Sequence, residues 1–175
     1  HPFWAAGFSF ARGHFAYRVP YDCCLPFVFM GEEISIGIRA WTHGYDLYAV
    51  ESSVLFHEYA KMSSRRRKVH MFWEQKRSAA DTGHESLKRL TAIIKMAPDV
   101  SDYDHTDENK YGLGRVRDVE LFYKLFLIDT IHRTSTQLCK FVKTGVMHRA
   151  FTPYIQTQLS QGIDYSQLHD FDTAK

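Results

Sequence analysis

Two adjacent carboxylates, Glu32 and Glu33, directly follow Gly31 at the expected start of a helix. Glycine has no Cβ, so its backbone can approach a ligand closely. Acidic residues in a first helical turn are favoured by about 0.3–1 kcal/mol through the helix dipole, which is the structural alternative for both. The apolar stretch PFVFM precedes them, and a carboxylate at an apolar wall can orient sugar hydroxyls with little competition from water. Glu32 and Glu33 are therefore candidate catalytic acids.

A histidine follows in the stretch SVLFHEY, close behind this helix. A lone histidine at a strand end is more often structural. The zinc-protease motif HExxH is excluded, because Lys61 stands where its second histidine is required. Three cysteines without a CxxC pair do not predict a structural zinc site either. His57 can still complete an oxygen-rich Mn²⁺ or Mg²⁺ site whose carboxylates come from elsewhere.

Length and composition predict one globular domain. The 175 residues are 45% hydrophobic and 15% aromatic, and the net charge of +2 gives no case for nucleic acid as a partner. The sequence contains no apolar stretch of membrane-span length and opens with no signal peptide. The cysteines Cys23, Cys24 and Cys139 are odd in number and two are adjacent, so they form no closed disulfide framework and favour a reducing compartment.

Basic residues are concentrated in SSRRRK at 63–68, directly after the histidine. Such a run is a solvated loop or a nuclear-import patch in one interpretation. In the other, Arg or Lys side chains clamp a diphosphate once a loop closes. Lys61 and Arg65 are the candidates for that clamp, and both interpretations stay open.

Periodicity predicts the elements that position these residues. Residues 32–43 are expected to form a helix, because Ile34, Ile38 and Trp41 recur at helical spacing and Gly44 can end it. On this spacing alone Trp41 belongs to the core. Residues 84–96 form a second amphipathic pattern. The other predicted elements are a buried strand at 4–12 with a bend at Ala6–Gly7, short strands at 46–50 and 53–59, an acidic loop at 99–109, and one or two helices at 118–144.

The order strand, loop, helix, strand, strand and then helices predicts an α/β fold. Three parts are expected: a catalytic part at 1–62, a basic linker at 63–83 and a helical accessory segment of the same domain at 84–175. Because the chain passes from His1 straight into an apolar stretch, we expect it to be the carboxy-terminal part of something longer.

Several motifs of the sequence resemble the polypeptide α-N-acetylglucosaminyltransferases. They are PFWAAGFSFARG, VPYD, GEEI, RAWTHGYDLY and FHEYA, with FWEQKR and YGLGRVRDVELFY downstream. That group includes the cytoplasmic enzyme that modifies hydroxyproline on the ubiquitin-ligase subunit Skp1. The polypeptide N-acetylgalactosaminyltransferases are more distantly similar. Gly31 and Glu32 fall on their glycine-glutamate, Arg39 and Trp41 on their Arg-x-Trp, and His57 on their metal-binding histidine.

The resemblance implies the C-terminal part of a GT-A fold and a retaining transferase that moves GlcNAc from UDP-GlcNAc to a polypeptide hydroxyl. Mn²⁺ or Mg²⁺ would be held on the diphosphate by a D-x-D motif and by His57. Glu32 would bind donor-sugar hydroxyls, and Glu33, where an amide is usual, would bind sugar or orient the acceptor. The residues implied as contacts of donor or acceptor are Ala6, Gly7, Asp22, Gly31, Arg39 and Trp41. A cytoplasmic location is expected, with the Golgi lumen, through an upstream anchor, as the alternative.

The D-x-D motif is the main departure from this family pattern. Asp102–Asp104 and Asp170–Asp172 have the right letters but follow His57, so we predict both to be solvated surface. The nucleotide half is expected to precede residue 1. The alternative function is a degenerate, non-catalytic transferase fold that binds a protein or glycan.

Overall fold

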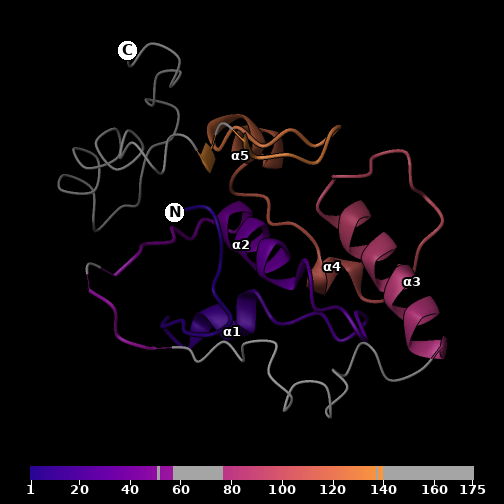
Figure 1. The fold of residues 1–175 in the computed structure, drawn as a ribbon, viewed down its shortest axis with the longest axis horizontal. Helices are drawn as coiled ribbons and strands as arrows, with labels where there is room; N and C mark the ends of the chain where they lie inside the picture. The colour runs from indigo at the N-terminus through magenta and orange to yellow at the C-terminus, as the bar shows by residue number, and fades with distance from the viewer. Residues whose placement is uncertain (51, 57–76, 137, 140–175) are drawn as a thin grey trace, which may run out of the picture.

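The computed structural model describes residues 1–50, 52–56, 77–136 and 138–139. These residues form five helices: α1 (His14–Arg18), α2 (Glu32–Thr42), α3 (Arg77–Ile93), α4 (Glu108–Tyr111) and α5 (Val119–Leu125). In Figure 1, α2 occupies the middle of the ribbon, between α5 above and α1 below, and α4 and the long α3 lie to its right. None of the described helices has the length and apolarity needed to cross a bilayer.

Helix α2 forms where the sequence predicts it. Gly31 precedes it with φ 116°, a conformation that side chains with a Cβ rarely adopt, and Glu32 and Glu33 occupy its first turn. The helix ends at Thr42, and Gly44 follows with φ 93°, in the left-handed conformation typical of a helix stop. The prediction of a helix at 32–43 that closes at Gly44 is confirmed.

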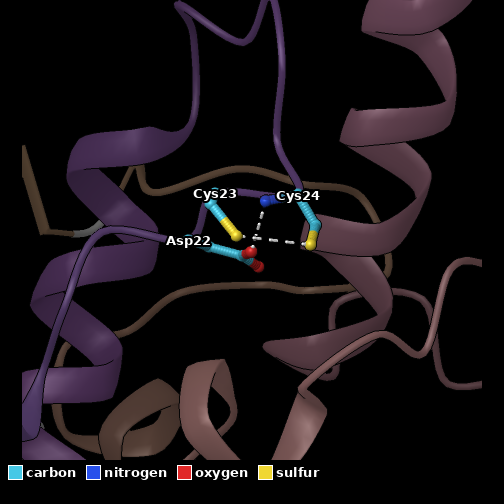
Figure 2. Close-up of side chains that lie close together, drawn as sticks. All are labelled: Asp22, Cys23 and Cys24. Atoms are coloured by element: carbon cyan, nitrogen blue, oxygen red, sulfur yellow. Dashed lines mark hydrogen bonds between the residues drawn. The ribbon is translucent and has the colours of Figure 1, made fainter.

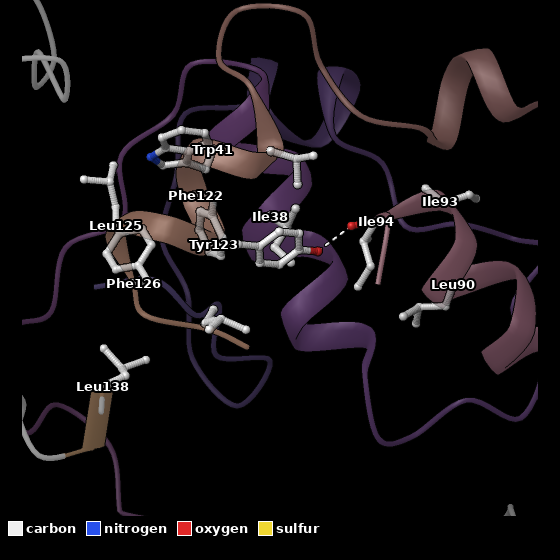
Figure 3. Packing of buried hydrophobic residues seen from close by; sticks show 12 residues of the cluster. Ile38, Trp41, Leu90, Ile93, Ile94, Phe122, Tyr123, Leu125, Phe126 and Leu138 are labelled. Carbon is white, nitrogen blue, oxygen red and sulfur yellow. Dashed lines mark hydrogen bonds between the residues drawn. The ribbon is translucent and has the colours of Figure 1, made fainter. Parts of the chain in front are cut away.

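Helix α2 is buried on two sides. On one side Ile38 and Trp41 pack with buried residues of α3 and α5, among them Leu90 and Phe122 (Figure 3). The rings of Trp41 and Phe122 meet edge to face with centroids 5.5 Å apart. A smaller cluster formed by Phe15, Val19, Ile36 and Ala40 covers the side toward α1. Apolar burial on both sides holds α2 in place along most of its length.

Helix α3 confirms the amphipathic prediction for 84–96, but it begins earlier, at Arg77, inside the predicted linker at 63–83. Its buried face repeats every three or four residues: Ser86, Arg89, Leu90 and Ile93. Leu87 points away from the core and is 42% exposed.

The predicted helical region at 118–144 begins with the short helix α5. The Asp118 side chain accepts a hydrogen bond of 3.0 Å from the Glu120 amide, which is the usual cap of a helix start. The chain turns away at Leu127, whose φ is 52°. Residues 99–109 are largely irregular, as expected, although α4 begins at Glu108.

The carbonyl end of α2 is fixed by the loop that follows α4. The buried Thr42 hydroxyl accepts a hydrogen bond from the Gly114 amide at 2.8 Å. The main-chain carbonyl of Thr42 accepts from the amides of Val116 and Arg117. A Cβ on Gly114 would lie 2.4 Å from the Thr42 carbonyl oxygen, so only glycine fits this approach.

The strand predictions for 4–12 and 46–50 are wrong, because the structure forms no strand there, and it forms none in 53–56, the described part of the strand predicted at 53–59. A strand needs a partner for its amides and carbonyls, and an isolated apolar stretch adopts other conformations without one. Among the described residues, the strand-like pairing is the isolated bridge between Asp129 and Thr134. At Ala6–Gly7, where the sequence predicts a bend within the strand, the structure has a turn. Residues 57–59 lie outside the described residues, and the GT-A fold stays a prediction.

Replacing Phe122 by alanine is expected to lower the free energy of unfolding by about 3–5 kcal/mol, because its fully buried ring leaves a cavity among α2, α3 and α5. Ile131→Ala is the control, since that side chain is 86% exposed, and its effect should stay within about 0.5 kcal/mol. Urea unfolding measures both. Equal effects of the two substitutions would contradict the packing described here.

Candidate active site

A buried ion pair fixes the segment that precedes α2. The Arg89 side chain is 0% exposed, and its Nε donates to Asp22 Oδ2 at 2.9 Å. The other two guanidinium nitrogens donate to the main-chain carbonyls of Asp104 and Thr106. Asp22 Oδ1 accepts from the Cys24 amide at 2.8 Å. Each buried charge is thus paired and hydrogen-bonded, as burial of a charge requires.

A cavity of about 260 Å³ opens beside this ion pair, and we call it the α2 cavity. Its lining residues are Tyr21, Asp22, Leu25, Val28, Glu32, Ser35, Ile36 and Arg39. The four from α2 are spaced i, i+3, i+4 and i+7, so they share one face of the helix. The volume lies just under the range of about 300–1,000 Å³ usual for small-molecule sites, which suits one sugar-sized group.

Two charged side chains of the α2 cavity have polar atoms without partners. Within the described residues, the buried atoms Glu32 Oε2 and Arg39 Nη2 make no hydrogen bond. Arg39 is 1% exposed; its Nη1 donates to the Pro20 carbonyl at 2.8 Å, and its Nε to Gly112 at 3.4 Å. An unsatisfied buried polar atom costs about 1–3 kcal/mol, so this pair offers an acceptor and a donor to a polar ligand.

Burial also shifts the acid–base properties of these two residues. It raises the pKa of Glu32 above its ordinary value, and the neighbouring Glu33 carboxylate adds to the effect. Burial lowers the pKa of Arg39 to about 10, so the guanidinium remains a cation at neutral pH. The α2 cavity therefore places a carboxylate with raised proton affinity and a fixed positive charge on one helix face.

Glu33 points elsewhere. Its Oε1 accepts a hydrogen bond of 2.8 Å from the Ala6 amide, which ties the start of α2 to the turn at Ala6–Gly7. That turn is exposed, and a Cβ on Gly7 would meet nothing within 4 Å. The adjoining segment walls a second hollow of about 560 Å³, lined largely by aromatic side chains. Of the two adjacent glutamates, Glu32 thus lines the α2 cavity and Glu33 binds the turn at Ala6–Gly7.

The structure brings together three of the residues predicted from the sequence: Asp22, Glu32 and Arg39 line the α2 cavity. Five others lie apart from it, and one of these is Glu33, which accepts from the Ala6 amide. Ala6 and Gly7 form the exposed turn. A Cβ on Gly31 would face Leu90 of α3 at 3.4 Å, and Trp41 is 2% exposed in the core, which confirms its prediction as a core residue. The candidate residues His57, Lys61 and Arg65 lie outside the described residues.

Sequence reasoning missed Ser35, Ile36 and Arg89. The first two follow Glu32 by three and four residues, so helical spacing was a sufficient signal for them. Arg89 follows Ser86 by three residues and therefore lies on the buried face of α3. Its pairing with Asp22, 67 residues earlier, had no signal in the sequence.

The described residues do not fit a Mn²⁺ or Mg²⁺ ion. In this part of the chain, the group of potential ligand atoms that lie within 4.8 Å of one another comes from Asp22, Cys23 and Cys24 (Figure 2). Two thiols are soft ligands, whereas Mn²⁺ and Mg²⁺ prefer oxygen. The Asp22 carboxylate is also already committed to Arg89. The functional groups that the α2 cavity offers to a ligand are the Glu32 carboxylate and the Arg39 guanidinium.

Comparison with known proteins gives one finding. A family model described as Glycosyltransferase (GlcNAc) matches residues 1–132. The match includes all residues that line the α2 cavity and continues past the predicted linker into α3 and α5. No curated protein and no solved structure matches the chain.

Replacing Arg89 by methionine is expected to lower the free energy of unfolding by about 3–5 kcal/mol, because the Asp22 carboxylate then remains buried without its partner. Lys88→Met is the matched control on the same helix. Its ion pairs are made with the exposed carboxylates of Asp102 and Glu85, so its effect should be below about 1 kcal/mol. Denaturant titration compares them, and a small effect of Arg89→Met would show that the pair does not organise the segment.

Glu32→Gln is expected to stabilise the chain at about pH 7 more than at about pH 4. The folded chain holds the Glu32 proton more tightly than the unfolded chain. Stability is therefore lost as the pH rises from the ordinary value of 4.5 through the raised value. Glu85→Gln, on the exposed surface of α3, gives the baseline for removing one carboxylate. Unfolding free energies at the two pH values test this; a gain that does not exceed the baseline contradicts it.

Proposed function

The chain belongs to the GlcNAc glycosyltransferase family. We propose that it is a retaining transferase, which moves GlcNAc from UDP-GlcNAc to a hydroxyl of a polypeptide, and that the described residues bind the donor sugar. The observation that carries the proposal is the α2 cavity. It has the volume of a sugar-sized group and contains a carboxylate oxygen and a guanidinium nitrogen that lack partners among the described residues.

The polar atoms of the α2 cavity match the hydrogen-bonding groups of a sugar. A hydroxyl both donates and accepts, so it can donate to Glu32 Oε2 while another oxygen accepts from Arg39 Nη2. Ser35, on the same helix face, adds a hydroxyl between them. Ile36, Leu25 and Val28 supply the apolar lining that excludes water and strengthens these contacts.

The charge of Glu32 also suits the transfer step. A sugar whose glycosidic bond is breaking passes through an oxocarbenium-like state and develops positive charge. A carboxylate held beside it by the helix stabilises that charge more strongly than the neutral ground state, which lowers the barrier. We assign Glu32 this function, and Arg39 the positioning of the sugar.

The polypeptide acceptor is proposed to lie near the aromatic hollow. Glu33 connects the two sites, because the carboxylate at the start of α2 holds the Ala6 amide next to the wall of that hollow. Phe8 and Tyr48 are each 46% exposed there and can contact a peptide. Hydroxyproline is the specific acceptor that we propose, following the resemblance to the Skp1-modifying enzymes.

Two further parts of the proposal come from the resemblance and the cysteines. A divalent metal on the diphosphate, with His57 as a ligand, would act as a Lewis acid on the leaving UDP. A cytoplasmic location is supported by Cys23, Cys24 and Cys139, which are all free thiols in the structure.

Glu32→Gln in the full-length protein is expected to lower kcat/KM for GlcNAc transfer by about tenfold to 100-fold, since a hydrogen bond to a charged group contributes about 1.5–3 kcal/mol. The assay measures UDP release and the mass of a hydroxyproline peptide. Glu85→Gln is the control, because this exposed carboxylate on α3 lies outside both hollows.

Two outcomes would reject this assignment. Unchanged transfer by Glu32→Gln would remove Glu32 from the sugar site. If the wild-type protein shows no turnover but binds a glycan or peptide equally well with and without EDTA, the chain is the non-catalytic binding module instead.

A further inference from the structure

Two adjacent thiols, Cys23 and Cys24, lie next to the α2 cavity and take no part in the proposed sugar chemistry. Figure 2 shows their side chains on the same side of the backbone, directly after Asp22. The two Sγ atoms are 3.6 Å apart and share a hydrogen bond. Cys23 is exposed to solvent, whereas Cys24 is partly buried. One sulfur is thus accessible to a reagent, and the other lies behind it.

The surroundings distinguish the two sulfurs chemically. Partial burial, followed by the hydrogen bond with Cys23, raises the pKa of Cys24 to about 11, so Cys24 keeps its proton at neutral pH. Cys23 carries the solvent-exposed sulfur of the pair, so it is the sulfur that a peroxide can reach. A thiolate is the nucleophilic form of cysteine.

We propose that Cys23 and Cys24 form a site of reversible oxidation, at which a hydroperoxide converts the two adjacent thiols to a disulfide. The Cys23 thiolate attacks the outer peroxide oxygen and breaks the O–O bond, which gives a sulfenic acid on Cys23 and an alkoxide that is protonated to an alcohol. The Cys24 sulfur then attacks the Cys23 sulfur and displaces water, with the Cys24 proton leaving in that water. Two electrons pass from the two thiols to the peroxide.

Strain makes this disulfide reducible. The Cα atoms of adjacent residues are about 3.8 Å apart, below the separation of about 4.4–6.8 Å usual for disulfides. The sulfurs must also approach from 3.6 Å to about 2.05 Å. Strained and exposed disulfides have higher reduction potentials than structural ones, so cellular thiols reverse them. The geometry therefore fits a regulatory modification and not a permanent cross-link.

Ring closure acts on the α2 cavity through one peptide group. The N–H of Cys24 belongs to the peptide that joins the two cysteines, and it donates to Asp22 Oδ1 at 2.8 Å. Closing the ring turns this peptide and weakens that hydrogen bond. Because Asp22 lines the α2 cavity and pairs with Arg89, oxidation alters a wall of the proposed sugar site.

The test treats the reduced full-length protein with hydrogen peroxide, blocks the remaining thiols with N-ethylmaleimide in denaturant, and locates the changes by peptide mass spectrometry. We expect the peptide with Cys23 and Cys24 to lose two hydrogen atoms and to take up no maleimide, while Cys139 is alkylated. Dithiothreitol should restore both thiols. The thermal unfolding midpoint should fall on oxidation and recover on reduction.

Three variants separate this pair from ordinary thiol oxidation. Cys139→Ser is the matched control and should oxidise like the wild type. Cys24→Ser has no second sulfur, so it should stop at a Cys23 sulfenic acid that dimedone traps; Cys23→Ser should give no dimedone adduct at Cys24. Full alkylation of both cysteines after peroxide, or a disulfide between Cys23 and Cys139, would overturn the proposal. The readout is mass, so it does not depend on glycosyltransferase activity.

Discussion

The arrangement of the described chain depends on one buried guanidinium. Arg89 joins α3 to two segments distant in sequence: it pairs with Asp22 before α2 and donates to the carbonyls of Asp104 and Thr106 before α4. A charge without solvent contact needs an ion pair or hydrogen bonds in place of water, since removing an ion from water costs several kcal/mol. These three segments can therefore pack together only in an arrangement that satisfies Arg89, which fixes where the α2 cavity lies.

The polar face of α2 is a cost to the fold. Helix α2 packs apolar residues toward both clusters, yet Glu32 and Arg39 occupy its remaining buried face with polar atoms that lack partners in the described structure. An apolar side chain of similar size would stabilise the fold more. Unsatisfied buried groups of this kind recur at functional sites, where a ligand supplies the missing partners and stability is exchanged for binding.

The short segment 20–24 combines three tasks. The Pro20 carbonyl accepts a hydrogen bond from Arg39, and the Asp22 carboxylate forms the ion pair with Arg89. The Cys24 amide donates to the same carboxylate. A change at the cysteines is therefore two hydrogen bonds away from Arg89. This proximity gives the oxidation chemistry of Cys23 a direct physical connection to the sugar site, without a long-range conformational change.

The sequence by itself determined helices α2 and α3 and the family. Helices α2 and α3 follow from local signals: apolar residues at helical spacing, Gly31 and Gly44 at the ends of α2, and carboxylates in its first turn. The motifs that resemble GlcNAc transferases all lie within residues 1–132, which the family model also matches. Strand prediction failed at 4–12 and 46–50, because a strand depends on distant partners that an apolar stretch does not specify.

Only the tertiary structure decided which polar residues meet. Adjacent residues of a helix point about 100° apart, so Glu32 and Glu33 cannot face the same ligand. The sequence could not say which of them faces the α2 cavity. Glu32 lines the α2 cavity together with Leu25 and Val28. Glu33 instead accepts the hydrogen bond from the Ala6 amide at the turn. Such contacts join residues far apart in the chain, and they are fixed by the satisfaction of buried charge rather than by any local pattern.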